Sequence, residues 1–468
     1  MCLQRSVSRD TIPAMQGAPG RSRTLSVSLA TSLACASVIG YSGSARAASI
    51  DCSSSTNVPN PVYIAGSSAS KSLILALAKS LGSSVSLIYA SIPSCQGLDD
   101  VLAQPAQQET STPSFASPTK GYLTCTNGTA AYGSYAVDIG ISDVVASSCI
   151  APQVTVGTGY SDFPGPIQAF EIAVPWASTE FAISAEAAYV VFGFGGQGYV
   201  VSPWNDPTAI WTRGDTSGTE IAIAEAIGLS AAKWGNGLSP EAGAAQQLGS
   251  ATLLTSALLE GAAAKPNTTI GILASSNVDP LKSPAGTNDA GAATGGLKPL
   301  AFQAINQDCS YYADSDLSHY DKINVRQGRY AIWGPQHFVS NVDGSGKPTV
   351  NPQGTNNLVP STQQGVEAVI NVITHNGLSA TSTPTLQQAI TNEANAYFIP
   401  TCAMQVSRTV ELGPEASYQP LQGCGCFFES LTGGGTTLSS YCEACKTDAD
   451  CGEGGAYPHC NFGYCEAQ

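Results

Sequence analysis

The chain has 468 residues and a formal net charge of −15; only 11% of its residues are charged, whereas 43% are hydrophobic. This composition excludes an intrinsically disordered chain, which combines low hydrophobicity with high charge. The acidic balance excludes nucleic acid as a partner, because a protein that binds it presents a basic face to the phosphates. The length predicts two or three domains, each large enough to bury a core.

Residues 1–47 have the pattern of a signal peptide. All their basic residues are arginines, and a short apolar run occupies 25–39. Ala45-Arg46-Ala47 then supplies the small residues of a signal-peptidase site, which predicts cleavage after Ala47. The apolar run is short for a membrane span, and no later run is long enough either, so we expect a soluble mature protein. Lipid attachment at Cys35 and initiation at Met15 stay open as alternatives.

Between residues 58 and 415, apolar runs typical of strands alternate with helical patterns. In chain order, we expect strands at 62–66, 84–90, 135–143, 170–177, 187–196 and 269–276. We expect helices at 71–81, from 97, from 218 and at 365–377, and a Gly/Ala-rich loop at 283–298. Strands that alternate with helices predict an α/β fold built on parallel sheets.

Seven of the 15 cysteines lie within residues 424–468. In an exported protein this density predicts a small module held together by disulfides. Cys442-x-x-Cys445 with the nearby His459 leaves half of a zinc site as the alternative. Two other cysteines belong to the predicted signal, so the mature chain has an odd number. At least one cysteine is therefore expected to be unpaired or bonded to another molecule, and the connectivity stays open.

The segment Arg213-Gly214-Asp215-Thr216-Ser217-Gly218-Thr219-Glu220 is the most informative of the chain. Ser217 and Glu220 fit a capping box, which places the start of a helix at about Gly218. A helix N-terminus offers free N–H groups and a partial positive charge to a small anion. Arg213 can direct two further donors at the same oxyanion. The alternative for this segment is an ordinary capped helix with a surface arginine.

Two further strand-to-helix turns have the same chemistry. Gly66-Ser67-Ser68 precedes the helix expected at 71–81, and Ser94-Cys95-Gln96-Gly97 precedes the next one. Taken singly, each is an ordinary helix cap. Together, three such turns at the carboxyl ends of parallel strands can hold an oxyanion.

The body of the chain resembles the phosphate-binding proteins that serve ABC transporters. The resemblance covers roughly residues 58–400 and is carried, in order, by IAGSSAS (64–70), YASIPSCQG (89–97), DIGISD (138–143) and RGDTSGT (213–219). It implies that phosphate is bound by Ser68, Ser94, Asp143, Arg213, Ser217, Gly218 and Thr219. It also implies that Asp215 holds the arginine. The sequence departs from the family at Ala69, where the family usually has an aromatic residue, and at Cys95 and Gln96, where it has small ones.

The resemblance implies an α/β fold with two lobes, of the type II periplasmic-binding-protein-like kind, followed by a small disulfide-rich C-terminal module. We expect lobe I to comprise 58–150 and, after the chain returns near Gly-Arg-Tyr-Ala-Ile-Trp-Gly (328–334), 328–415. Lobe II is expected at 151–327 and the cysteine-rich module at 424–468.

Asp143 gives a physical reason to prefer phosphate to sulfate. A buried carboxylate repels an anion unless the anion brings a proton, and hydrogen phosphate has one at neutral pH whereas sulfate has none. The mispaired sulfate complex is therefore disfavoured. Ser94 and Ser217 are hydroxyls near Arg213, but no general base and no catalytic motif accompanies them, so we expect no enzyme activity, no cofactor and no metal.

The sequence thus predicts an exported binding protein for inorganic phosphate, periplasmic or secreted to the cell surface, serving ABC-type uptake. The expected partners are phosphate and an ABC permease, and the protein is expected to be a monomer. The alternative is a secreted or surface-attached adhesion protein that reuses the binding fold, with the cysteine-rich tail as its contact. Whether the phosphate is transported, sensed or scavenged stays open.

Overall fold

The structure is a computed structural model, and it describes residues 48–466 except for short internal gaps at 104–107, 151, 197, 235–245, 285–294, 434–437 and 453–456. The predicted signal peptide and most of the loop expected at 283–298 lie outside the described residues.

Lobe I is built on three parallel strands and one antiparallel strand. β2 (Pro61–Ser67) lies between β3 (Ser86–Ile92) and β7 (Ile139–Ser142) and is parallel to both. β15 (Trp333–Asn341) then pairs antiparallel with β7. The sheet continues beyond β3 through four short strands: β4 (Ser114–Ser117), β5 (Gly121–Asn127), β1 (Ser49–Asp51) and β6 (Ala130–Ala131).

Lobe II repeats this strand order. β10 (Ile210–Thr212) lies between β11 (Gln246–Gln247) and β12 (Ile270–Ala274) and is parallel to both. β8 (Tyr160–Pro175) pairs antiparallel with β12. The other strands of this region are β13 (Leu297–Pro299), which pairs with β8, and the pair β9 (Ala182–Ser184) and β14 (Ala301–Gln303).

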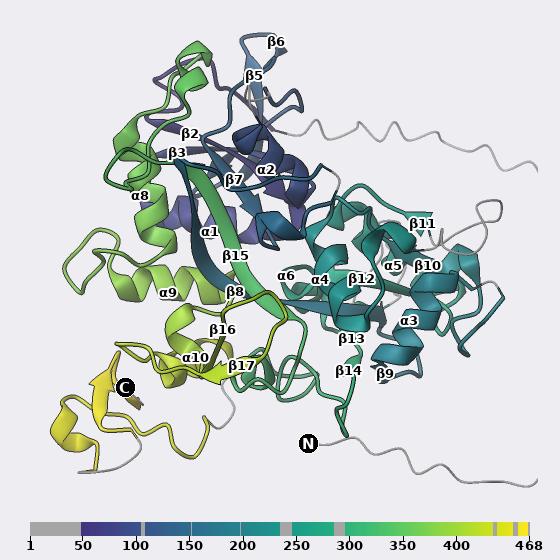
Figure 1. Cartoon of the computed structure of the whole chain (residues 1–468). Coiled ribbons are helices and arrows are strands. Elements are labelled where there is room, and N and C mark those ends of the chain that lie inside the picture. The colour runs from purple at the N-terminus through teal and green to yellow at the C-terminus, as the bar shows by residue number, and fades with distance from the viewer. Residues whose placement is uncertain are drawn as a thin grey trace, which may run out of the picture.

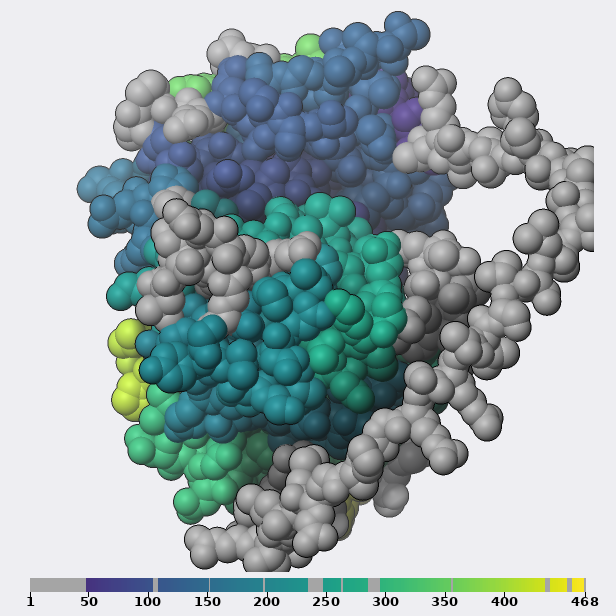
Figure 2. All heavy atoms as spheres, turned by 90° about the vertical axis from the view of Figure 1, so that its right-hand side faces the viewer, coloured from purple at the N-terminus to yellow at the C-terminus, as the bar shows by residue number. Residues whose placement is uncertain are grey.

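The two lobes are joined by long crossing strands. The 16-residue strand β8 pairs with β15 along its first part and with β12 along its second, so a single path of hydrogen-bonded strands runs through both lobes. Figure 1 shows β8 and β15 side by side between the lobes, and Figure 2 shows the purple-to-blue lobe resting on the teal lobe. The predicted α/β class with two lobes is confirmed.

Helices cover both faces of the sheets. Those of lobe I are α1 (Lys71–Leu81), α2 (Ser94–Leu102), α8 (Gln363–Ile373) and α9 (Leu386–Asn395). The remaining helices are α3 (Ala185–Phe194), α4 (Gly218–Ile227), α5 (Ala251–Ala264), α6 (Ser275–Val278), α7 (Ile323–Arg326) and α10 (Gly425–Thr432). Within the part of the chain that the structure describes, no helix is long and apolar enough to cross a membrane.

The expected helix at 71–81 is confirmed, and its apolar face explains it. Leu73, Leu77 and Leu81 recur at helical spacing and are buried with residues of α8 such as Val366 and Ile370. Burial of this face from water is what stabilises the helix.

The strand expected at 187–196 is wrong, because most of this segment belongs to helix α3. Ser184 caps the helix by accepting a hydrogen bond from the Ala187 N–H, and Gly195 ends it in the left-handed conformation. The buried positions Ala188, Val191 and Phe192 follow helical spacing. Apolar residues also fill several positions between them, which hides the period in the sequence.

Six disulfides join twelve of the described cysteines: Cys52–Cys125, Cys95–Cys149, Cys402–Cys424, Cys426–Cys442, Cys445–Cys460 and Cys451–Cys465. Cys309 is disulfide-bonded too, so none of the cysteines in the described part of the chain is the free thiol that the odd count allowed. The zinc alternative is wrong, because Cys442 and Cys445 are each bonded to another cysteine.

The predicted disulfide-rich module is confirmed, and it is attached to the body rather than free. It contains α10 and the hairpin of β18 (His459–Asn461) and β19 (Tyr464–Glu466). The buried guanidinium of Arg326, in α7, donates to the Glu429 carboxylate of α10 over 2.9 Å. The Cys402–Cys424 disulfide closes a segment, here called the strap (residues 402–424), which carries the hairpin of β16 (Val406–Arg408) and β17 (Glu415–Ser417).

Candidate anion site between the lobes

Three glycines let the chain pack closely at the carboxyl ends of the lobe I strands. A Cβ on Gly66, which has a φ of +131°, would lie 2.0 Å from the Ile141 carbonyl oxygen. A Cβ on Gly97 would lie 2.4 Å from the Ala65 carbonyl oxygen, and one on Gly140 would lie 2.6 Å from that of Gly97. Such distances are too short for any side chain. The glycines therefore place β2, β7 and the start of α2 around one point.

Asp143, directly after β7, lies at this point and is 1% exposed. Its carboxylate accepts hydrogen bonds from the Ser67 hydroxyl over 2.5 Å and from the Thr219 hydroxyl over 2.9 Å. Burial raises the pKa of Asp143, and the two hydroxyls and the guanidinium of Arg213 oppose that rise. Because each carboxylate oxygen has two lone pairs, the Asp143 carboxylate can still accept a hydrogen bond from a ligand that carries a proton.

Arg213 follows β10 and is buried beside this carboxylate. Its Nε donates to the Leu248 carbonyl over 2.9 Å, and its Nη2 donates to the Gly249 carbonyl over 3.2 Å. These two bonds orient the guanidinium and leave the remaining N–H donors for a ligand. Burial lowers the pKa of Arg213, whereas Asp143 and Glu220 raise it.

The first turn of α4 offers backbone donors at the same place. The helix begins at Gly218 with Ser217 as its N-cap, as expected, but the side chain of Ser217 accepts no capping hydrogen bond. The predicted capping box is therefore wrong. Burial raises the pKa of Glu220, in the first turn of this helix, well above its ordinary value, and the nearby Arg213 opposes that rise.

Ser94 and Gly218 meet across the interface of the lobes. A Cβ on Gly218 would lie 2.7 Å from the Ser94 Oγ and 2.7 Å from the Asp143 Cβ. The Ser94 Oγ itself accepts a hydrogen bond from the Asp143 N–H over 3.4 Å. The structure thus brings Ser94, Asp143, Gly218 and Thr219 together, with Arg213 beside the carboxylate.

Several hydrogen bonds hold the two lobes closed around this site. The Cys95 N–H of lobe I donates to the Thr216 carbonyl of lobe II over 3.1 Å. The Ala251 N–H at the start of α5 donates to the Ser68 Oγ over 3.1 Å, and the Ser276 hydroxyl of α6 donates to the Ala69 carbonyl over 2.8 Å. The bond from Thr219 to Asp143 also crosses the interface. The structure is therefore that of a closed pair of lobes.

Asp215 and Ala69 are the two supporting residues expected from the sequence. The guanidinium of Arg213 is held by the two carbonyls named above, and Asp215 forms no ion pair with it among the described residues. The Ala69 N–H donates to the Ser67 Oγ over 3.2 Å. Cys95, which departs from the family pattern, is joined to Cys149 and so fixes the first turn of α2.

Three residues that support the site are not among the ligands predicted from the sequence: Ser67, Tyr89 and Gln336. Ser67 bonds Asp143 directly, and the Tyr89 hydroxyl donates to the Ser67 carbonyl over 2.5 Å. Gln336, on β15, lies close enough to Asp143 to favour its ionised form. Ser67 adjoins the predicted ligand Ser68 and belongs to the same turn. Gln336 is on the crossing strand β15, where no sequence motif marks a ligand-binding position.

A second cluster of carboxylates, Glu171, Asp279 and Asp314, lies buried in lobe II within the spacing of a metal site. The ammonium groups of Lys282 and Lys322 both contact Asp279 and Asp314, at 2.6–3.1 Å. Two lysines at this distance supply the positive charge that a metal ion would bring, so the cluster is a buried ion-pair network.

Searches with this chain found no matching family model and no matching curated protein. Among solved structures, it is similar to a putative phosphate ABC transporter substrate-binding protein with bound phosphate from Clostridium perfringens, at 13% identity over 73% of this chain and 100% of that one, with a TM-score of 0.42. It is also similar to an ABC-type phosphate transport receptor from Vibrio cholerae, at 13% identity over 72% and 99% of the two chains and a TM-score of 0.37. A human phosphate-binding apolipoprotein matches at 14% identity over 72% and 90%, with a TM-score of 0.40. These identities and scores are low, so the ligand has to be argued from the site itself.

Proposed function

We propose that the protein binds inorganic phosphate, as hydrogen phosphate, between its two lobes, without enzymatic turnover. The observation that carries the proposal is the buried Asp143 carboxylate beside Arg213 and the first turn of α4. Hydroxyls, N–H groups and one guanidinium suit an oxyanion, and a single carboxylate acceptor suits an oxyanion that has a proton.

The proposed ligands are Ser68, Ser94, Asp143, Arg213, Ser217, Gly218 and Thr219. Ser67 is added as the residue that orients Asp143, since its hydroxyl donates to that carboxylate. Asp215 and Ala69 are left out of the proposed set, because the guanidinium of Arg213 is held by two carbonyls and the Ala69 N–H is donated to Ser67.

The proposed setting is the periplasm or the cell surface, with delivery of phosphate to an ABC permease by a monomeric protein. The disulfides of the described chain support export, because such bonds persist in oxidising compartments. The adhesion alternative stays a prediction. The proposed delivery role predicts permease and ATPase genes beside this one.

The test is isothermal titration calorimetry with phosphate and with sulfate on protein freed of bound anion. Wild-type protein should prefer phosphate, and Asp143→Asn should reduce that preference about 10- to 100-fold, which corresponds to about 1–3 kcal/mol for a mispaired buried group. The exposed Asp308→Asn is the matched control and should leave both affinities unchanged. Equal affinities of the wild-type protein for the two anions would refute the proposal.

A further inference from the structure

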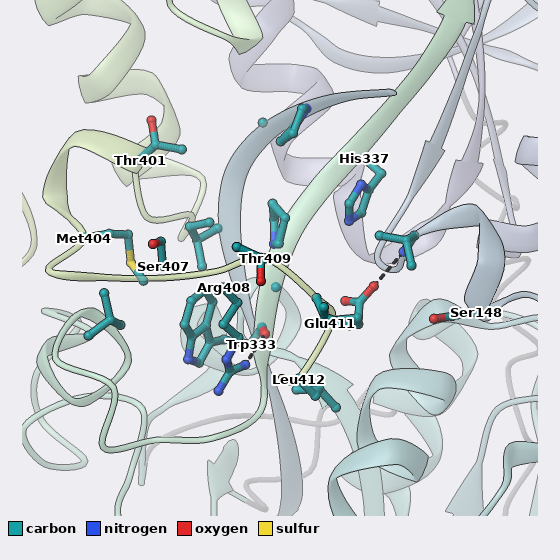
Figure 3. Close-up of a pocket in the computed structure, with 18 of the residues that line it drawn as sticks. Ser148, Trp333, His337, Thr401, Met404, Ser407, Arg408, Thr409, Glu411 and Leu412 are labelled. Atoms are coloured by element: carbon teal, nitrogen blue, oxygen red, sulfur yellow. Dashed lines mark hydrogen bonds between the residues drawn. The ribbon is translucent and has the colours of Figure 1, made fainter. Parts of the chain in front are cut away.

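A cavity of about 560 Å³ lies behind the anion site, between the crossing strands and the strap. Its walls come from β8 and β15, the loop that follows β7, Glu225 of α4, and the strap from Met404 to Tyr418. Figure 3 shows these side chains around one space. The volume lies within the range of sites for small organic molecules.

The cavity is built by fixed contacts. The Arg408 guanidinium donates to the Trp333 carbonyl over 3.0 Å and pairs with the Glu415 carboxylate over 2.7 Å. The Glu411 carboxylate accepts a hydrogen bond from the Val145 N–H over 2.6 Å. The Cys402–Cys424 disulfide closes the strap at its base. These contacts hold the cavity open before any ligand arrives, which lowers the ordering cost of binding.

Most of the lining is apolar. Trp333, Ile167 and Met404 are buried in the protein and line the cavity together with Val406 and Leu412. A flat or branched hydrocarbon body therefore finds an indole and aliphatic side chains to pack against.

One end of the cavity is polar, and a buried group there lacks a partner. The Nδ1 of His337 lies 2.7 Å from the Asp162 carboxylate, and the ring is 4% exposed. His337 lines the cavity, and its buried Nε2 has no hydrogen-bond partner among the described residues. In Figure 3 the ring points toward the end where Glu411 lies. A buried, unpaired ring nitrogen calls for a polar group on a ligand.

The charges at this end are mainly negative. When His337 is neutral and its Nδ1–H is donated to Asp162, its Nε2 is an acceptor, and Asp162 and Glu411 are the carboxylates at this end. Glu225 stands exposed at the cavity wall. The positive charge of Arg408 is offset by Glu415. Burial raises the pKa of Glu411 to about 7; His337 and the Val145 N–H bond oppose this rise, whereas Glu225 and Asp143 add to it. A cationic head group would relieve this repulsion.

We propose that this cavity is a second ligand site, which takes a small organic amine with an apolar body. The ammonium group pairs with Glu411 and lies beside His337, and the body packs on Trp333. Val145, from lobe I, and Glu225, from α4 of lobe II, both line this cavity. The bound amine therefore contacts both lobes. This inference is independent of the proposed phosphate function.

The test is calorimetry with 2-naphthylmethylamine and, as a matched probe of opposite charge, 2-naphthoate, on the mature disulfide-bonded chain without added phosphate. The amine should bind with a stoichiometry of one and at least tenfold more tightly than the acid. Glu411→Gln, which can still accept the Val145 N–H, should weaken the amine about tenfold. The exposed Glu186→Gln is the control and should have no effect.

Equal affinities for the two probes, or no binding of the amine up to millimolar concentration, would overturn the proposal. The comparison of the probes on the natural chain decides the question even where Glu411→Gln fails to fold. If it folds and binds the amine as tightly as the natural chain, the assignment of Glu411 is refuted. None of these outcomes depends on phosphate binding.

Discussion

Replacing Gly218 with alanine tests whether the closed arrangement of the lobes is the one that binds the anion. Gly218 belongs to lobe II, whereas its two nearest neighbours, Ser94 and Asp143, belong to lobe I. The added Cβ would lie 2.7 Å from the Ser94 Oγ and 2.7 Å from the Asp143 Cβ. Both distances are shorter than ordinary van der Waals contact, so one lobe has to withdraw from the other.

The expected loss of phosphate affinity in Gly218→Ala follows from overpacking at the contact between the lobes. A methyl group forced into a close-packed contact costs about 1–3 kcal/mol, and here the cost falls on the closed state alone. If phosphate binds only to the closed state, its affinity falls by the same free energy, about 5- to 160-fold. Alanine is a better helix former than glycine by up to about 1 kcal/mol, so the protein without ligand should not lose stability.

Calorimetry with phosphate and thermal unfolding without it separate the two effects. Gly214→Ala is the matched control, because the nearest atom to its added Cβ would be the Thr216 Oγ1 at 4.0 Å. Gly214→Ala should leave phosphate affinity unchanged. An unaltered phosphate affinity in Gly218→Ala would show that binding does not require this contact between the lobes, and the reasoning would fail.

Three further predictions concern other parts of the molecule. Arg213→Lys should weaken phosphate and sulfate alike, by at least about tenfold in calorimetry, because a single ammonium cannot replace a guanidinium that two carbonyls hold in place; a selective loss of one anion would contradict this. The double variant Cys402→Ser, Cys424→Ser should lower the free energy of unfolding by about 3 kcal/mol, because it opens a loop with a sequence separation of 22. An unchanged unfolding midpoint in denaturant would refute this prediction. Burial and the neighbouring Glu109 raise the pKa of Asp100 to about 8 from 3.8. The stability that Asp100 contributes is therefore complete below pH 4 and is lost as the pH rises to 8, by up to about 1.4 kcal/mol per pH unit. Asp100→Asn should therefore flatten the fall of the unfolding temperature between pH 4 and pH 8.

Local patterns in the sequence predict a helix or strand correctly where only one surface of that element is buried. The leucines of α1 recur at helical spacing because only one face meets the core. The start of α4 at Gly218 is predicted correctly, although the capping hydrogen bond expected from Ser217 is not formed. In α3 an almost uninterrupted apolar run hides the helical period, so the sequence predicts a strand where the structure has a helix. Propensity and periodicity cannot separate these two cases in a short apolar run.

The site shows the same division between local and distant information. Asp143 and Arg213 stand in recognisable turns, but their partners are far away in the chain: Ser67 lies 76 residues before Asp143, and the carbonyl that accepts from the Arg213 Nε is 35 residues later. The cavity behind the site combines β8, β15 and the strap, which no local pattern connects. The polar end of this cavity is defined by the contacts of His337, which the sequence does not predict.

The strand order has a consequence for how the protein reaches its native state. The described strands of lobe II all lie between Tyr160 and Gln303. The sheet of lobe I is completed only by β15, which is made about 190 residues after β7 and has to enter between β7 and β8. Until it does, the facing edges of β7 and β8 are open strands that can pair with another chain. Lobe II should therefore fold first, and the insertion of β15 should set both the folding rate and the tendency of incomplete chains to aggregate.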